Sequence, residues 1–250
     1  MTPGCLYLVP TPLGPDEDPL RVLPPATVEI AARLDYFVAE NARSARAVLK
    51  RLPLARPLQQ LEIRELSEHT RDSELPSLLA PVLAGRDAGL LSEAGCPAIA
   101  DPGAALVALA HRSAVRVVPL VGPSSLLLAL MASGMNGQQF AFAGYVPASE
   151  PQRAQRLRAL ERRASDGAET VLIIETPYRT QALFDAMLQT LSPQTLLGVA
   201  LDLTLPGERI ATRTIAQWRL ERPTLPRSPA VFTLSAPSRP ARAATVRRTS

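Results

Sequence analysis

Short apolar runs alternate with amphipathic segments through the first half of the chain. The runs predict strands at residues 6–9, 36–39, 88–92 and 115–120. Segments with the helical spacing of apolar residues lie among them, at residues 27–34, 42–52, 73–85 and 104–112. Because the strands are too apolar to leave one face in water, this alternation predicts a parallel sheet with helices on both faces.

The second half of the chain has a different order of elements. Helices are predicted at residues 126–132, 150–164 and 179–191, and strands at 140–145, 170–174, 196–201, 209–215 and 230–234. Only one predicted helix separates the last four strands, so we expect antiparallel pairs, with a hairpin that turns near Pro206 and Gly207. The sequence therefore predicts two α/β domains: residues 1–121 with a mainly parallel sheet, and residues 122–237 with a mixed sheet. A ligand-binding cleft is expected between them.

Three turns rich in glycine and proline each follow an apolar strand, at residues 9–14, 92–103 and 119–125. Carboxyl ends of parallel strands share one edge of a sheet, so all three turns can contact one ligand. Since any strand-to-helix turn favours Gly, Pro and Asp, purely structural turns are the alternative. The chain lacks both the glycine fingerprint of dinucleotide binding and a phosphate loop. We therefore expect a ligand that is not held by its phosphates.

Composition narrows the class of protein. The chain has 250 residues, 46% of them hydrophobic, which is enough for a sizeable core. It has no run of about 18 uncharged apolar residues and no signal-like N-terminus, so the sequence predicts a cytoplasmic protein without a membrane span. Its two cysteines and two histidines fit neither a disulfide framework nor a metal site.

Basic residues cluster in three places. The net charge is +4, and residues 238–250 contain four arginines and no acid, which predicts a basic, disordered tail or an electrostatic aid to RNA binding. Two further basic runs have helical spacing: Arg43, Arg46, Lys50 and Arg51, and then Arg153, Arg156, Arg158, Arg162 and Arg163. Either run could contact phosphates or form an ordinary solvated helix face. Tyr145 and Tyr178 are the aromatic side chains best placed to stack on bases.

Five motifs, in this order along the chain, resemble the tetrapyrrole methylase superfamily. They are LYLVPTPLG at residues 6–14, SEAGCPAIADPG at 92–103, VPLVGPSS at 118–125, FAFAGYVP at 140–147 and ETPYR at 175–179. Within the superfamily the chain is most similar to the methyltransferases of small-subunit ribosomal RNA. The likeness extends over residues 6–234.

The resemblance implies a homodimeric, two-domain methyltransferase that binds S-adenosylmethionine in the cleft between its domains. The cofactor contacts that it implies are Leu13, Glu93, Gly95, Cys96, Ser124 and Ser125 from the first domain, and Ile174, Leu201 and Ala230 from the second. The acceptor that it implies is a ribose 2′-hydroxyl of small-subunit ribosomal RNA, with the small ribosomal subunit as partner. Candidate RNA contacts are Arg43, Arg153, Arg156 and Tyr178.

A ribose hydroxyl must lose its proton when it is methylated, so a nearby base would speed the reaction. Glu68 and His69 resemble a Glu-His pair of the family, and histidine titrates near neutral pH. His69 is therefore the first candidate base, and Glu40 and Glu93 come next. The alternative is an exposed histidine without a catalytic role.

Three motifs depart from the family pattern. Its Glu-Asp-Thr-Arg is Glu-Asn-Ala-Arg at residues 40–43, its Ser-Asp-Ala-Gly-Thr-Pro is Ser-Glu-Ala-Gly-Cys-Pro at 92–97, and its Arg-Glu-Leu-Thr-Lys segment is replaced at 200–205. These changes indicate a divergent subgroup. Two alternatives stay open: a methyltransferase of tetrapyrroles or other small molecules, and a non-catalytic protein that binds S-adenosylmethionine.

Overall fold

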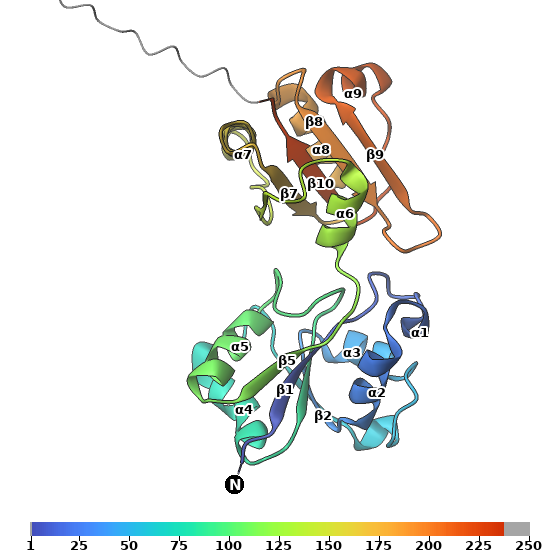
Figure 1. Cartoon of the computed structure of the whole chain (residues 1–250), viewed down its shortest axis with the longest axis vertical. Coiled ribbons are helices and arrows are strands. Elements are labelled where there is room, and N and C mark those ends of the chain that lie inside the picture. The colour runs from blue at the N-terminus through green and yellow to red at the C-terminus, as the bar shows by residue number, and fades with distance from the viewer. Residues whose placement is uncertain (1, 238–250) are drawn as a thin grey trace, which may run out of the picture. The chain divides into compact units, whose positions relative to one another are not determined.

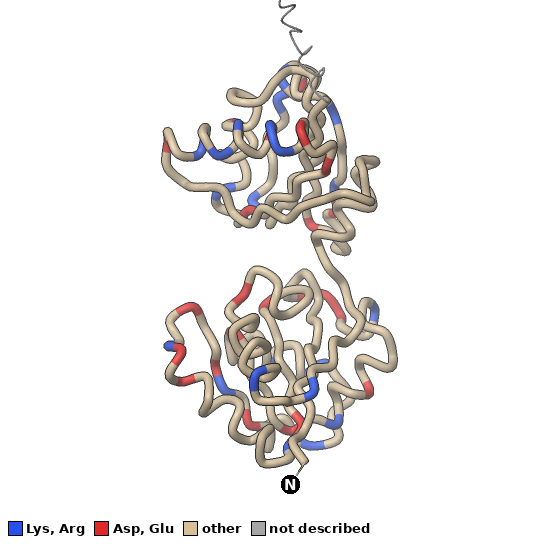
Figure 2. The backbone as a smooth tube through the Cα atoms, turned by 60° about the vertical axis from the view of Figure 1, so that its left-hand side comes forward, with Lys and Arg blue, Asp and Glu red and all other residues tan. Residues whose placement is uncertain are grey.

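The computed structural model describes residues 2–237, and the chain divides between Ser125 and Leu126 into two compact units (Figure 1). The sequence predicted a boundary a few residues earlier, near Gly122. The predicted basic tail at residues 238–250 lies outside the described residues. Lysine and arginine positions are interspersed with acidic ones over both units (Figure 2).

The first unit is built on a parallel sheet of five strands in the order β3-β2-β4-β1-β5, so the predicted parallel sheet is confirmed. Its strands are β1 (Cys5–Val9), β2 (Tyr36–Ala39), β3 (Glu62–Glu65), β4 (Ala88–Leu91) and β5 (Arg116–Pro119). Its helices are α1 (Pro19–Val22), α2 (Pro25–Arg33), α3 (Ala42–Leu49), α4 (Leu75–Leu83) and α5 (Gly103–Arg112), with short 3-10 turns at Leu58–Gln60 and Asp72–Glu74.

Helices cover both faces of this sheet because its strands carry apolar residues on both sides. Leu90 packs toward α4 and α5 in one buried cluster, and the next residue, Leu91, packs toward α2 and α3 in another. All four residues of β2 and of β4 are buried. The burial holds the strands in fixed register, so the loops after β1, β2, β4 and β5 meet at one edge.

The second unit is built on a mixed sheet in the order β6-β7-β10-β8-β9, in which β6 and β7 are parallel and the other neighbours antiparallel. Its strands are β6 (Phe140–Phe142), β7 (Thr170–Glu175), β8 (Leu196–Leu201), β9 (Arg209–Thr214) and β10 (Ala230–Ser235). Its helices are α6 (Ser125–Ser133), α7 (Gln152–Gly167), α8 (Thr180–Thr190) and α9 (Ile215–Glu221). The predicted hairpin is confirmed by the pairing of β8 with β9.

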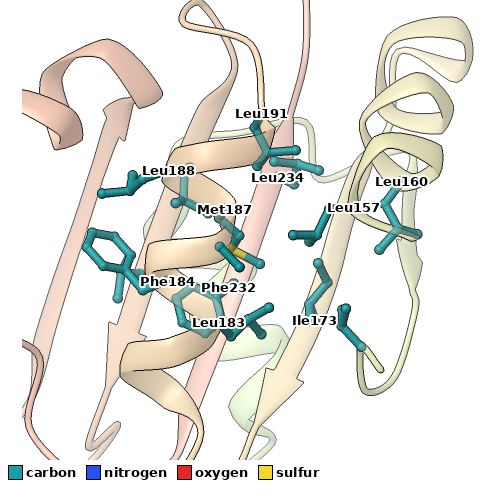
Figure 3. Packing of buried hydrophobic residues seen from close by; sticks show 14 of the residues in the cluster. Leu157, Leu160, Ile173, Leu183, Phe184, Met187, Leu188, Leu191, Phe232 and Leu234 are labelled. Atoms are coloured by element: carbon teal, nitrogen blue, oxygen red, sulfur yellow. The ribbon is translucent and has the colours of Figure 1, made fainter. Parts of the chain in front are cut away.

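The core of the second unit lies between its sheet and the helices α7 and α8 (Figure 3). Leu157 and Leu160 come from α7, Leu183 and Met187 from α8, and Phe232 from the central strand, all fully or almost fully buried. The amphipathic pattern that predicted α8 therefore corresponds to its buried face.

Three elements differ from the sequence prediction. Strand β3 was missed because Ile63 is its only apolar residue, and helix α1 was missed because it has only four residues. The expectation of a single helix among the last four strands is wrong, since α9 follows β9. Helix α9 starts at a capping box of Thr214 and Gln217. No helix within residues 2–237 is both long enough and apolar enough to cross a membrane.

Candidate active site

The three glycine- and proline-rich turns of the first unit meet at the carboxyl edge of its sheet. We name them the β1 loop (residues 10–14), the β4 loop (92–102) and the β5 loop (120–124). Thr11 and Gly95 form an isolated antiparallel bridge, with N–H to O distances of 2.9 and 3.2 Å. The Thr11 side chain is fully buried, and its hydroxyl donates to the Ser92 carbonyl at 3.4 Å. The prediction that these turns converge is confirmed, because the β1 and β4 loops are hydrogen-bonded to each other.

The β5 loop joins this pair through two close approaches. The Cys96 thiol donates to the Pro123 carbonyl at 3.4 Å, and burial raises the pKa of that thiol. Gly95 has φ +74°, and a Cβ there would lie 3.1 Å from Leu13 Cδ2 and 3.4 Å from the Pro123 oxygen. The glycine is thus required both by its left-handed backbone and by the close packing of the three loops.

Carboxyl groups collect at the same edge. Glu40 follows β2, and its Oε2 accepts the backbone N–H of Glu93 at 3.3 Å. Glu93 is exposed, and the Ser44 hydroxyl donates to its Oε1 at 3.4 Å. Burial raises the pKa of Glu40, and the charges of Asp101, Glu93 and Glu68 raise it further, although the Glu93 N–H acts in the opposite direction. The edge is therefore acidic, and Glu40 holds a proton to a higher pH than an ordinary carboxyl group.

Asp101 holds the far end of the β4 loop. Its two carboxylate oxygens accept the N–H groups of Ala98 at 2.8 Å and Gly103 at 2.7 Å. Ala98 and Ala100 have φ of 66° and 60°, a left-handed conformation that is costly for alanine. Burial raises the pKa of Asp101, against the effect of these backbone donors. A carboxyl group bonded to one of these two strained residues, Ala98, indicates a loop with a defined shape.

Asn41, which replaces an acid of the family motif, keeps a structural role. Its side-chain oxygen accepts the N–H groups of Arg43 at 2.9 Å and Ser44 at 3.1 Å, and so caps α3. Asparagine and aspartate cap helices about equally well. The start of α3, which carries Ser44, is therefore maintained without the carboxylate.

His69 lies beyond β3, on a surface loop. Its side chain is 87% exposed, and its Nε2 lies 3.7 Å from an oxygen of Glu68, which is equally exposed. Glu68 contributes to the charge that acts on Glu40. The pair thus borders the acidic edge without being part of the buried loop contacts.

The three cofactor candidates of the second unit come together at one end of its sheet. Ala230 pairs with Leu201 across β10 and β8, and Val231 pairs with Ile174 across β10 and β7. Leu201 and Ala230 are buried, and Ile174 is partly exposed. In the first unit, Ser124 and Ser125 end the β5 loop, and both are partly exposed.

The segment after β7 contains one exposed and one buried functional group. Tyr178 is 85% exposed. Glu175 has a fully buried side chain, and its Oε2 lies 2.8 Å from Nη2 of Arg179. Arg179 also donates to the Val146 carbonyl at 2.5 Å. The ETPYR motif therefore builds a buried ion pair and presents a tyrosine to solvent.

The two basic runs differ in how many of their cations are engaged. In the first run, Arg51 donates to the Glu17 carbonyl at 2.8 Å, whereas the other three are exposed. In the second run, on α7, Arg153 pairs with Glu150 at 2.9 Å and Arg163 pairs with Glu169. Its other members, Arg156, Arg158 and Arg162, are exposed.

Sequence reasoning missed the residues that connect the loops. Ser44 lies 49 residues from Glu93, and Thr11 lies 81 residues from Ser92, so local patterns carry no sign of either contact. Asp101 could have been found, because Asp-Pro-Gly immediately precedes a helix and aspartate commonly bonds nearby backbone N–H groups.

Comparison with known proteins agrees with this architecture. The sequence matches the tetrapyrrole (corrin/porphyrin) methylases over residues 6–218. The ribosomal RNA small subunit methyltransferase I of Mesorhizobium japonicum is 35% identical over 211 residues, which are 84% of this chain and 67% of that protein. The proteins of the same name from Synechocystis sp. and Bacillus subtilis are 32% and 30% identical. Their matches cover 85% and 86% of this chain, and 71% and 68% of the respective relatives.

Solved structures share the fold. The uroporphyrin-III-C-methyltransferase of Thermus thermophilus has a TM-score of 0.58 at 20% identity, covering 93% of this chain and 97% of that one. The methyltransferase CobJ has a TM-score of 0.60 at 16% identity, covering 93% and 94%. The family match and the relatives above make the chain a methyltransferase, and its fold is of the two-unit α/β class. The chain belongs to the tetrapyrrole (corrin/porphyrin) methylase family.

Proposed function

We propose that the protein transfers a methyl group from S-adenosylmethionine to a ribose 2′-hydroxyl of small-subunit ribosomal RNA. The observation that carries the proposal is the carboxyl edge of the first sheet, where three loops are bonded together beside an acidic cluster. The acceptor is inferred from relatives that are 30–35% identical and are named ribosomal RNA small subunit methyltransferase I.

The residues at this edge fit the proposed donor chemically. S-adenosylmethionine carries its methyl group on a positively charged sulfur, which the carboxylates of Glu93 and Glu40 would attract. An adenosine without phosphates needs apolar surface and backbone groups, and the partly buried side chains of Leu13 and Cys96 beside Gly95 offer both. We assign these residues and Ser124 and Ser125 to the donor, and propose that Ile174, Leu201 and Ala230 contribute from the second unit.

Glu40 is the base that the geometry favours. It is half-buried, its pKa is raised, and its carboxyl group lies beside the Glu93 loop that we assign to the donor. His69 stays the competing candidate, although the only close polar partner of its side chain among the described residues is the exposed Glu68. Positioning of donor and acceptor can supply about 7–11 kcal/mol of the barrier, and a base adds roughly 10²- to 10⁴-fold.

The first prediction concerns binding and transfer by the wild-type protein. Calorimetric titration with S-adenosylhomocysteine should give saturable binding, and Glu93→Ala should weaken the binding of S-adenosylmethionine, whose sulfur carries the positive charge. Labelled methyl transfer should then be measured with small ribosomal subunits, purified ribosomal RNA and a tetrapyrrole extract side by side. Label confined to RNA is expected. Label only in the tetrapyrrole extract would identify a small-molecule methyltransferase, and binding without any transfer would favour the non-catalytic alternative. A homodimer and a cytoplasmic location stay predictions from the resemblance and the sequence.

The second prediction concerns Glu40. Glu40→Gln keeps a side-chain oxygen that can accept the Glu93 N–H, but it cannot take a proton. We expect turnover to fall by about 10²- to 10⁴-fold while the affinity for S-adenosylhomocysteine changes little. The wild-type rate should rise with pH through the raised pKa of Glu40, and this rise should be absent in the variant. If His69→Ala removes the pH-dependent rise and Glu40→Gln does not, the base is His69.

The same substitution has a predicted effect on stability. Because the pKa of Glu40 is raised in the folded state, the folded protein binds that proton more tightly than the unfolded chain does. The stabilisation that this proton provides is therefore complete at pH values below the pKa of Glu40 in the unfolded chain. It is lost as pH rises through the pKa of Glu40 in the folded protein. Urea denaturation across that pH window should show that Glu40→Gln becomes more stable relative to wild type as pH increases.

A further inference from the structure

Helix α3 carries a strip of cations that begins at the acidic edge. Arg43, Arg46 and Lys50 are spaced i, i+3 and i+7, so they follow one face of the helix. All three are exposed, while Ala45, Val48 and Leu49 form the buried face. Within residues 2–237 no carboxylate lies within 4 Å of any of these three cations. We call them the α3 strip.

The arrangement of the α3 strip lowers the stability of its own helix. Arg43 and Arg46 are like charges at i and i+3, and Arg46 and Lys50 are like charges at i and i+4, which repel each other. Arg43 also lies in the first turn, where the helix dipole disfavours a cation. No acidic residue of α3 compensates them, whereas two of the five arginines of the run on α7, Arg153 and Arg163, have acidic partners. Arg46 in the last turn and Lys50 at the C-cap do gain from the helix dipole. The repulsion among the three cations and the position of Arg43 nevertheless remain uncompensated by any acid of α3, and an external anion would compensate them.

We propose that the α3 strip binds the phosphate backbone of the RNA acceptor and directs its ribose toward the methyl-donor site. This inference rests on the proposed function and names the surface that would serve it. Asn41 caps α3 directly after Glu40, and Ser44 on the first turn holds Glu93, so the strip starts where we place the donor. With a rise of about 1.5 Å per residue, the three cations extend over roughly 10 Å of the helix axis. The acidic residues that suit the positively charged methyl donor thus lie next to the basic residues that suit the negatively charged RNA, and both belong to the first unit.

RNA is the occupant that the charges favour. Phosphate binding requires several Lys or Arg contacts and no base-specific geometry, which an unpaired strip of guanidinium and ammonium groups supplies. The strip has no neighbouring aromatic residue on α3, so we expect it to determine affinity and position rather than base specificity.

The test compares two triple variants with the same change in charge. One replaces the strip, Arg43→Gln/Arg46→Gln/Lys50→Gln, and the control replaces exposed arginines elsewhere in the same unit, Arg21→Gln/Arg112→Gln/Arg116→Gln. Affinity for purified small-subunit ribosomal RNA is measured against salt concentration, and S-adenosylhomocysteine binding and the far-ultraviolet circular dichroism spectrum are recorded for each protein.

For the strip variant we expect RNA affinity to fall at least tenfold and the slope of log affinity against log salt to decrease by about 2 to 3 units, the effect of losing three phosphate contacts. Binding of S-adenosylhomocysteine should stay as in wild type, and the control variant should keep the wild-type slope. Equal losses in both triple variants, or an unchanged slope in the strip variant, would refute the proposal while leaving RNA methylation by the wild type in place. Displacement of RNA by polyglutamate at equal charge would indicate an acidic protein partner instead and overturn it. Wild type that methylates no RNA would contradict the proposed function itself.

Discussion

Gly122→Ala should disable the first unit as a methyl-donor site. A Cβ on Gly122 would lie 2.3 Å from Cβ and 2.6 Å from Cγ of Pro10, distances that real Cβ atoms do not adopt. The proline ring is rigid, and two hydrogen bonds fix the chain around Gly122. The Leu120 N–H donates to the Leu8 carbonyl at 3.0 Å, and the Thr27 hydroxyl donates to the Val121 carbonyl at 2.7 Å. The β1 and β5 loops must therefore separate.

We expect turnover to fall about 100-fold, because displacement by about 1 Å is enough to disturb reactive geometry. Overpacking should also lower the unfolding free energy by about 1–3 kcal/mol. Gly137→Ala is the matched control, since a Cβ at Gly137 meets nothing within 4 Å. A Gly122→Ala protein with wild-type turnover and wild-type urea midpoint would mean that these loops tolerate separation and do not form the site.

The sequence was sufficient to predict what depends on local pattern. Strand β2 is found at the predicted residues because all four of its positions are apolar and buried. The loop edge followed from three turns after such strands, and the Thr11–Gly95 bridge confirms their convergence. The same reasoning failed for β3, whose polar residues are tolerated at the edge of the sheet.

The chemistry of the site was less predictable than its location. Glu40 was identified from its motif, but its raised pKa depends on burial and on Asp101, Glu93 and Glu68, which only the fold brings near. The reverse holds for Arg51, which the sequence presents as a free cation and which donates in the fold to the carbonyl of Glu17, 34 residues away. Long-range contacts of this kind are determined by packing, so one sequence read by its periodicity cannot supply them.

Arg179→Ala should strongly destabilise the second unit, although Arg179 itself is partly exposed. Oε1 of Glu175 accepts the Thr176 N–H at 2.7 Å. Within residues 2–237, however, Oε2 accepts no hydrogen bond and is compensated only by the nearby charge of Arg179. Removing the guanidinium leaves a carboxylate that is fully buried and unpaired. We expect the unfolding free energy of this unit to fall by about 3 kcal/mol, the lower end for breaking a buried pair, because Arg179 is itself 37% exposed and partly screened by water.

Two further variants separate the charge from the space that the side chain fills. Glu175→Leu/Arg179→Met removes both charges and keeps apolar volume, so it should recover most of the lost stability in urea denaturation. Tyr178→Ala, one residue away and 85% exposed, should change the unfolding free energy by less than about 0.5 kcal/mol. If Arg179→Ala lowers the unfolding free energy by less than about 1 kcal/mol, the pair is an ordinary surface ion pair. If the double variant is as unstable as Arg179→Ala, Arg179 acts through its contact with the Val146 carbonyl rather than through Glu175. The expected results would show that the ion pair of Glu175 and Arg179 stabilises the turn after β7, and that the exposed Tyr178 on this turn does not contribute to stability.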